Sequence, residues 1–174
     1  MKQKRCILVI DDKSQSAVIK GFKSKYSKDF DLDFIAIRTG AAELKKDDSE
    51  DLDIDKLKTE IESKIKGKHL DIALSDFELE CPYFTGLDAV DLVHKIRKNV
   101  SFFVYSGNWN EVIKSVVGQE YQKASIEELV GGVNKLLNSQ VIDCIDRTDY
   151  QDILIDYLNK EKGNSIEYQL ATSL

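Results

Sequence analysis

Several apolar segments of this sequence end on acidic, hydroxylic or basic side chains, the residue types that bind metal ions and phosphoryl groups. The first is CILVI, residues 6–10, which runs directly into the adjacent carboxylates of Asp11 and Asp12. Ligands of open α/β sheets bind at the carboxyl ends of the strands, where such side chains would meet. The candidates, in chain order, are Asp11 and Asp12 after residues 6–10, Asp76 after residues 69–75, Ser106 after residues 100–105 and Lys123 at the end of residues 120–123.

Three carboxylates crowd together if the strand before Asp11 and Asp12 neighbours the strand before Asp76. Two such charges about 4 Å apart repel by roughly 4 kcal/mol at an effective dielectric of 20. A hard divalent cation offsets this repulsion, and Mg²⁺ favours one or two carboxylates together with water and phosphate oxygens. The doubled aspartate is therefore interpreted as half of a Mg²⁺ site.

These candidates need a sheet to position them, and the sequence alternates between the two kinds of element. Short, β-branched apolar runs predict buried strands, and apolar residues at helical spacing predict the helices between them. A capping box, Ser125 with Glu128, predicts the start of the last of these helices, which is expected to be a core helix. Buried strands joined by helices indicate a parallel sheet that is covered on both faces. The predicted strands are residues 6–10, 32–37, 69–75, 100–105 and 120–123.

Two segments lie outside this alternation. An insertion at about residues 41–68 surrounds the second helix, which Gly67 is expected to stop. Residues 140–174 form a C-terminal extension with one amphipathic helix, which either packs back on the domain or docks a partner. The predicted organisation is thus one domain over residues 1–139 followed by a helical tail.

The composition of the chain argues against some classes of partner. The chain has 174 residues, a net charge of −6 and a pI near 5.0, so it lacks the basic surface of a nucleic-acid binder. Its three cysteines have no disulfide or zinc spacing and are expected to be reduced thiols in a cytoplasmic protein. The first apolar run is too short for a membrane span or signal peptide, so no membrane partner is expected.

The residues at the strand ends resemble the receiver domain of two-component response regulators. The resemblance covers about residues 4–138 and rests on the stretches ILVIDD, DIALSD and VYSG together with the order of the five candidates. It implies a flavodoxin-like, three-layer α/β/α fold. That fold has a five-stranded parallel sheet of order 2-1-3-4-5, here with a further C-terminal helix.

The same resemblance implies roles for individual residues. Asp76 would accept a phosphoryl group from a histidine kinase or phosphotransfer protein, and Ser106 and Lys123 would contact the phosphoryl oxygens. Asp11, Asp12, Asp76 and the backbone carbonyl of Glu78 would bind Mg²⁺. The chain would not be an enzyme but a stand-alone signalling receiver that assists its own phosphotransfer and dephosphorylation and acts through contact with a downstream protein.

The sequence also departs from the family pattern. The glycine after the acceptor, Gly86, comes ten residues on rather than eight, Ala124 replaces the proline after Lys123, and Glu120 replaces the usual aromatic residue. One alternative is therefore a pseudo-receiver, a docking module with this fold that does not use phosphorylation. A second is a phosphatase of the haloacid dehalogenase type, which would need an acid where Lys13 stands.

Overall fold

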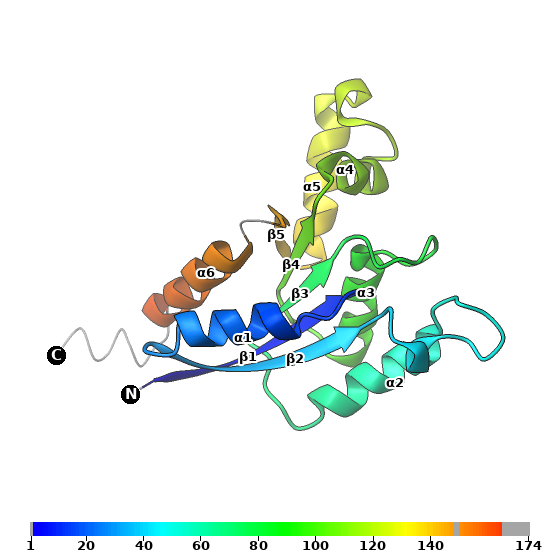
Figure 1. Ribbon diagram of the computed structural model, residues 1–174. Helices are drawn as coiled ribbons and strands as arrows, with labels where there is room; N and C mark the ends of the chain where they lie inside the picture. The colour runs from blue at the N-terminus through cyan, green and yellow to red at the C-terminus, as the bar shows by residue number, and fades with distance from the viewer. Residues whose placement is uncertain (1, 148–149, 165–174) are drawn as a thin grey trace.

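Five parallel strands form the central sheet, in the order β2-β1-β3-β4-β5 (Figure 1). The computed structural model describes residues 2–147 and 150–164. The strand order and the parallel pairing confirm the predicted flavodoxin-like architecture. The strands are β1 (Gln3–Asp11), β2 (Phe30–Arg38), β3 (Ile72–Asp76), β4 (Phe102–Ser106) and β5 (Val141–Asp146).

Helices cover both faces of the sheet, with α1 and α6 on one side and α2 and α3 on the other (Figure 1). None of the described helices is long and apolar enough to cross a membrane. The helices are α1 (Ser16–Lys25), α2 (Ile54–Ile65), α3 (Gly86–Ile96), α4 (Trp109–Val117), α5 (Ile126–Asn138) and α6 (Tyr150–Asn164), and two 3-10 turns are η1 (Ala42–Leu44) and η2 (Tyr121–Lys123).

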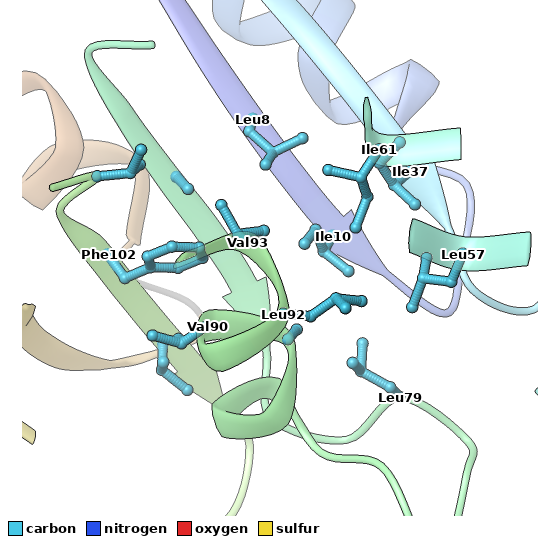
Figure 2. Close-up of a cluster of buried hydrophobic side chains, with 14 of the residues drawn as sticks. Leu8, Ile10, Ile37, Leu57, Ile61, Leu79, Val90, Leu92, Val93 and Phe102 are labelled. Atoms are coloured by element: carbon cyan, nitrogen blue, oxygen red, sulfur yellow. The ribbon is translucent and has the colours of Figure 1, made fainter. Parts of the chain in front are cut away.

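The apolar run of β1 is continuous because alternate side chains enter two separate cores. Leu8 and Ile10 point toward Leu57 of α2 and Val93 of α3 in the larger core (Figure 2). Ile7 belongs to the opposite core, which α1 and α6 cover. With both faces buried, the polar side chains of the central strands are confined to the strand ends, where Asp11, Asp76 and Ser106 lie.

The fifth strand is not where the sequence analysis placed it. Residues 121–123 form the 3-10 turn η2, and the strand that pairs with β4 is β5, residues 141–146. The helix α6 then packs on the sheet, since Leu154 and Leu158 are fully buried. The predicted boundary after residue 139 is therefore wrong as a division between domain and tail, because residues 141–158 complete the sheet and its cover.

The helix α5 begins at the predicted capping box, in which the Ser125 hydroxyl and the Glu128 carboxylate both take part. Its expected place in the core is wrong, however, because Gly132 is the residue of this helix that is buried.

The inserted segment before α2 contains η1, and α2 ends at Ile65, shortly before Gly67 adopts a left-handed conformation with φ +71°. That left-handed glycine agrees with the expected stop.

Candidate functional site

Three carboxylates meet at the carboxyl edge of the sheet, as the sequence predicted. Asp11 ends β1 and Asp12 follows it, Asp76 ends β3, and the two strands are neighbours. One oxygen from each carboxylate lies within 4.8 Å of the others. All three residues are nearly inaccessible, with 3%, 4% and 2% of their surface exposed. The result is a buried acidic cluster at the end of the two central strands.

Asp11 is held by three donors. Its Oδ1 accepts from the backbone N–H of Lys13 at 2.8 Å, and its Oδ2 accepts from Gln15 Nε2 at 2.8 Å and from the Tyr105 hydroxyl at 2.5 Å. Burial nevertheless raises the pKa of Asp11 to about 6, because removal from water disfavours the charged form more than these hydrogen bonds favour it. Asp11 is therefore held in one orientation, and it takes up a proton at a higher pH than a solvated aspartate does.

Asp76 is bound by Arg147, a residue that the sequence analysis did not select. Arg147 Nη2 donates to Asp76 Oδ1 at 2.9 Å and to Oδ2 at 2.6 Å, and the backbone N–H of Glu78 donates to Oδ1 at 3.2 Å. Burial raises the pKa of Asp76, while the hydrogen bond and the charge of Arg147 oppose that shift. The guanidinium group thus supplies the positive charge in direct contact with Asp76.

Lys123 does not take the position that the resemblance assigned to it. It lies in η2, outside the sheet; its side chain is 69% exposed, and its ammonium group pairs with Glu120 at 2.9 Å. Arg147 directly follows β5, as Ser106 ends β4 and Asp76 ends β3. The signal for Arg147 in the sequence was therefore its place after VIDCID, an apolar run that two acidic residues interrupt.

Ser106 lies at the same edge of the sheet, with 1% of its surface exposed. Its hydroxyl accepts from the backbone N–H of Asn108 at 2.9 Å and donates to the Asn108 carbonyl at 3.2 Å. Its own carbonyl accepts from the backbone N–H of Arg147 at 3.2 Å, which ties the ends of β4 and β5 together. Ser106, which the sequence predicted, and Arg147, which it did not, therefore lie side by side at the ends of adjacent strands.

Two glycines allow the backbone to close around the acidic cluster. A Cβ atom on Gly86 would lie 2.3 Å from the Asp76 carbonyl oxygen, and one on Gly40 would lie 2.5 Å from the Asp12 carbonyl oxygen. Both distances are shorter than a Cβ atom tolerates, so only glycine fits at these two positions without a shift of the backbone. Gly86 begins α3, so it also fixes the long loop after β3 against the end of that strand.

Tyr105 connects the cluster to the face of the sheet that α6 covers, and sequence reasoning missed this connection. Its ring stacks on Tyr150, the first residue of α6, with centroids 5.1 Å apart and planes 18° apart. Burial raises the pKa of Tyr105, which keeps the hydroxyl protonated as a donor to Asp11.

No protein-family model and no curated protein sequence matches this chain. Solved structures do. The response regulator receiver protein from Pseudoalteromonas atlantica is 10% identical and has a TM-score of 0.51 over 89% of this chain and 94% of that chain. The response regulator receiver domain protein from Clostridium thermocellum is 12% identical, with a TM-score of 0.50 over 91% and 97%. The chain has the receiver-domain fold.

The acidic cluster of this receiver fold suits a hard divalent cation. Three buried carboxylates face one guanidinium group, and the Lys13 ammonium group lies 3.8 Å from Asp12 on an exposed side chain. The cluster therefore has more negative than positive groups when its carboxylates are ionised, and oxygen-only donors of this kind are the ligands of Mg²⁺. The Glu78 carbonyl, a fourth expected ligand, belongs to the turn that follows Asp76, and its role stays a prediction.

Proposed function

We propose that this chain is a response regulator receiver that accepts a phosphoryl group on Asp76 in a Mg²⁺-dependent reaction. One observation carries the proposal. Asp76 is buried beside Asp11 and Asp12 at the carboxyl edge of the sheet, and Arg147 contacts both of its carboxylate oxygens. A nucleophilic carboxylate with adjacent positive charge is the arrangement that phosphoryl transfer requires.

The chemistry follows from these groups. A carboxylate oxygen of Asp76 attacks the phosphorus of a donor phosphoryl group; the new O–P bond forms as the bond between phosphorus and the donor atom breaks. Asp11, Asp12 and the Glu78 carbonyl would hold Mg²⁺, which supplies charge neutralisation on the phosphoryl oxygens. Arg147 supplies a second positive charge, and it must shift from the carboxylate to those oxygens as the group arrives.

Ser106 is the hydroxyl that would contact the bound phosphoryl group. Its hydrogen bonds to Asn108 lie within the turn that begins α4. A hydroxyl that turns toward a phosphoryl oxygen gives up its donor bond to that turn, so the start of α4 is the segment that responds first. Lys123, which is exposed and paired with Glu120, has no part in the proposed chemistry.

The proposed partners follow from the reaction. A histidine kinase or a phosphotransfer protein donates the phosphoryl group, and a downstream protein reads the altered surface. The net charge of −6 argues against nucleic acid as that partner. We place this activity in the cytoplasm because the spacing of the three cysteines fits neither a disulfide framework nor a zinc site. The chain would act as a signalling receiver rather than as an enzyme with a separate substrate.

A second candidate function is a pseudo-receiver that docks partners without phosphorylation. The observation in its favour is the same ion pair, because a guanidinium group on both oxygens of Asp76 blocks the nucleophile and already balances its charge. The two functions differ in whether Arg147 yields to an incoming phosphoryl group.

Incubation with acetyl phosphate, with and without Mg²⁺, tests the proposal by intact mass. The receiver function predicts one added phosphoryl group that requires Mg²⁺ and is absent from Asp76→Asn. Lys123→Ala is the matched control and should be labelled as the wild type is. An unlabelled wild type that still binds Mg²⁺ would leave the pseudo-receiver as the function.

A further inference from the structure

Tyr105 is a buried tyrosine to which the proposed chemistry gives no role. It lies on β4 with 2% of its surface exposed, and its hydroxyl donates to Asp11 Oδ2 at 2.5 Å across the intervening strand β3. Its ring belongs to the core that α1 and α6 cover (Figure 1). One side chain therefore contacts both the acidic cluster and the helical cover of the sheet.

The hydrogen bonds to Asp11 determine which of its oxygens can still accept a ligand. Within the described residues, Oδ2 accepts from Tyr105 and from Gln15, and Oδ1 accepts from the backbone N–H of Lys13. Each carboxylate oxygen has about two acceptor positions. Both positions on Oδ2 are thus filled and one on Oδ1 stays open, so Tyr105 and Gln15 turn Oδ1 toward a ligand of the cluster.

The start of α6 is joined to the same cluster at two points. The Tyr150 ring stacks on Tyr105, with centroids 5.1 Å and planes 18° apart, and Tyr105 in turn binds Asp11. Arg147, three positions before Tyr150, binds both carboxylate oxygens of Asp76. The segment that leads from β5 into α6 therefore contacts one carboxylate directly and a second one through Tyr105.

We propose that Tyr105 is a positioning residue of the cation site and that it couples occupancy of this site to the docking of α6. The inference rests on the metal site of the proposed function and not on phosphorylation. With Mg²⁺ bound, the Asp11 carboxylate stays in the orientation to which the Tyr105 hydroxyl donates, so the ring under Tyr150 is fixed as well. Such coupling is reciprocal, and a docked α6 favours the cation by the same factor.

Titration of the full chain with Mg²⁺, followed by NMR, tests the positioning role. Tyr105→Phe removes the hydroxyl and keeps the ring, and it should weaken Mg²⁺ binding about 10- to 100-fold, as loss of a hydrogen-bond partner of a metal ligand does. Gln15→Met removes the other donor to Oδ2 and should also weaken binding. A purely structural role of Tyr105 would lower the melting temperature and leave the Mg²⁺ affinity unchanged.

Tyr26→Phe is the matched control. The Tyr26 hydroxyl donates to Asp152 in the first turn of α6 at 3.1 Å, but Tyr26 follows the end of α1 that is far from Gln15 and the cluster. This variant loses a hydroxyl contact with the same helix and should bind Mg²⁺ as the wild type does. Tyr150→Leu leaves every donor to Asp11 in place, and through the coupling alone it should weaken Mg²⁺ binding about fivefold.

Hydrogen exchange of the backbone amides of residues 154–158, with and without saturating Mg²⁺, tests the coupling to α6. Mg²⁺ should slow this exchange in the wild type, in Tyr26→Phe and in Gln15→Met. The slowing should be absent from Tyr105→Phe, because its ring no longer bonds to Asp11.

Three results would overturn the inference. Tyr105→Phe could bind Mg²⁺ as tightly as the wild type, or Mg²⁺ could leave exchange in α6 of the wild type unchanged. With either result, Mg²⁺-dependent labelling of the wild type by acetyl phosphate would still support the proposed function. A wild type that binds no Mg²⁺ would contradict the metal site itself and this inference with it.

Discussion

At the scale of single residues, the acidic cluster depends on a cation that reaches it from a partly exposed position. The Arg147 side chain is 41% exposed, whereas that of Asp76 is 3% exposed. Removal of one partner of a buried pair is costly because the other charge remains without compensation, but the exposure of Arg147 reduces that cost through solvent screening. We therefore expect the pair to order the site and still to open when a phosphoryl group arrives.

Arg147→Ala should lower the free energy of unfolding by about 1–3 kcal/mol without metal, because Asp76 loses its positive partner. Urea denaturation at neutral pH measures the change. Lys123→Ala should stay within about 0.5 kcal/mol of the wild type, as exposed substitutions usually do. A loss in Lys123→Ala that matched the loss in Arg147→Ala would mean that Lys123 also serves the site.

Tyr105→Phe removes one hydroxyl and keeps the ring that stacks on Tyr150. The buried Asp11 carboxylate then loses a donor, so the variant should be less stable by about 1–3 kcal/mol. Tyr121→Phe, at a residue that is 54% exposed, should be neutral. Thermal unfolding of both variants makes the comparison, and equal melting temperatures would show that the hydroxyl contributes nothing to the fold.

Asp11 makes metal-free stability depend on pH. Its pKa rises from 3.8 to about 6 on folding, so the folded state binds the proton more tightly than the unfolded state. The resulting stabilisation is complete below about pH 4 and is lost as the pH rises through about 6, a loss of about 3 kcal/mol from this group. Denaturant titrations at pH 4 and pH 7 should show this loss in the wild type and a smaller one in Asp11→Asn. Identical pH dependence in both proteins would contradict the shift.

At the scale of elements, the loop between β3 and α3 is held in place by the close backbone contact of Gly86 with Asp76. Gly86→Ala would force a Cβ atom against the Asp76 carbonyl, and the displacement should cost about 3 kcal/mol, as overpacking typically does. Gly21→Ala is the matched control. Gly21 lies within α1 with open space around it, so alanine there should stabilise by about 1 kcal/mol. Thermal unfolding distinguishes the two directions, and a neutral Gly86→Ala would show that the loop can move.

The sequence predicted the elements whose signal is local and failed where position depends on pairing. β1 and β3 are continuous apolar runs that end on acids, so the acidic cluster could be found from the sequence. β5 mixes Val141, Cys144 and Ile145 with acidic residues and has an irregular register with β4, so its pattern is weak. The fifth strand was predicted before Lys123 because a lysine was expected at the end of that strand. Arg147, which follows the actual strand, was therefore not predicted as a site residue.

The helix α5 shows the same limit. Its apolar periodicity predicted a helix correctly, and the capping box gave the start. Periodicity does not say which surface an apolar face covers, because a helix that packs on its own sheet and one that packs on another molecule present similar patterns. The exposure of Val130 and Val133 follows from the placement of β5 and α4, which only the three-dimensional structure provides.

At the scale of the whole molecule, we expect β5 and α6 to be required for folding, because they complete the sheet and its cover. A chain that ends at Gln140 leaves the edge of β4 unpaired and exposes Phe103, whose ring packs on Tyr157 of α6. This truncation should lack a cooperative thermal transition by far-UV circular dichroism. A chain that ends at Asn164 retains every described element and should unfold as the full chain does. A cooperative transition in the shorter chain would show that residues 1–140 fold alone.

The long path from Ser106 to Arg147 has a consequence for biosynthesis. α4, η2 and α5 are all translated before β5, and Arg147 follows Asp76 by 71 residues. Chains emerge from the ribosome N-terminus first, at about 5–20 residues per second, so the nascent protein carries its three carboxylates for several seconds before their guanidinium partner exists. During that interval β4 lacks the strand that pairs with its outer edge, and Asp76 lacks its guanidinium partner. The arrangement of side chains around Asp76 is therefore completed in a single late step, when the last strand docks.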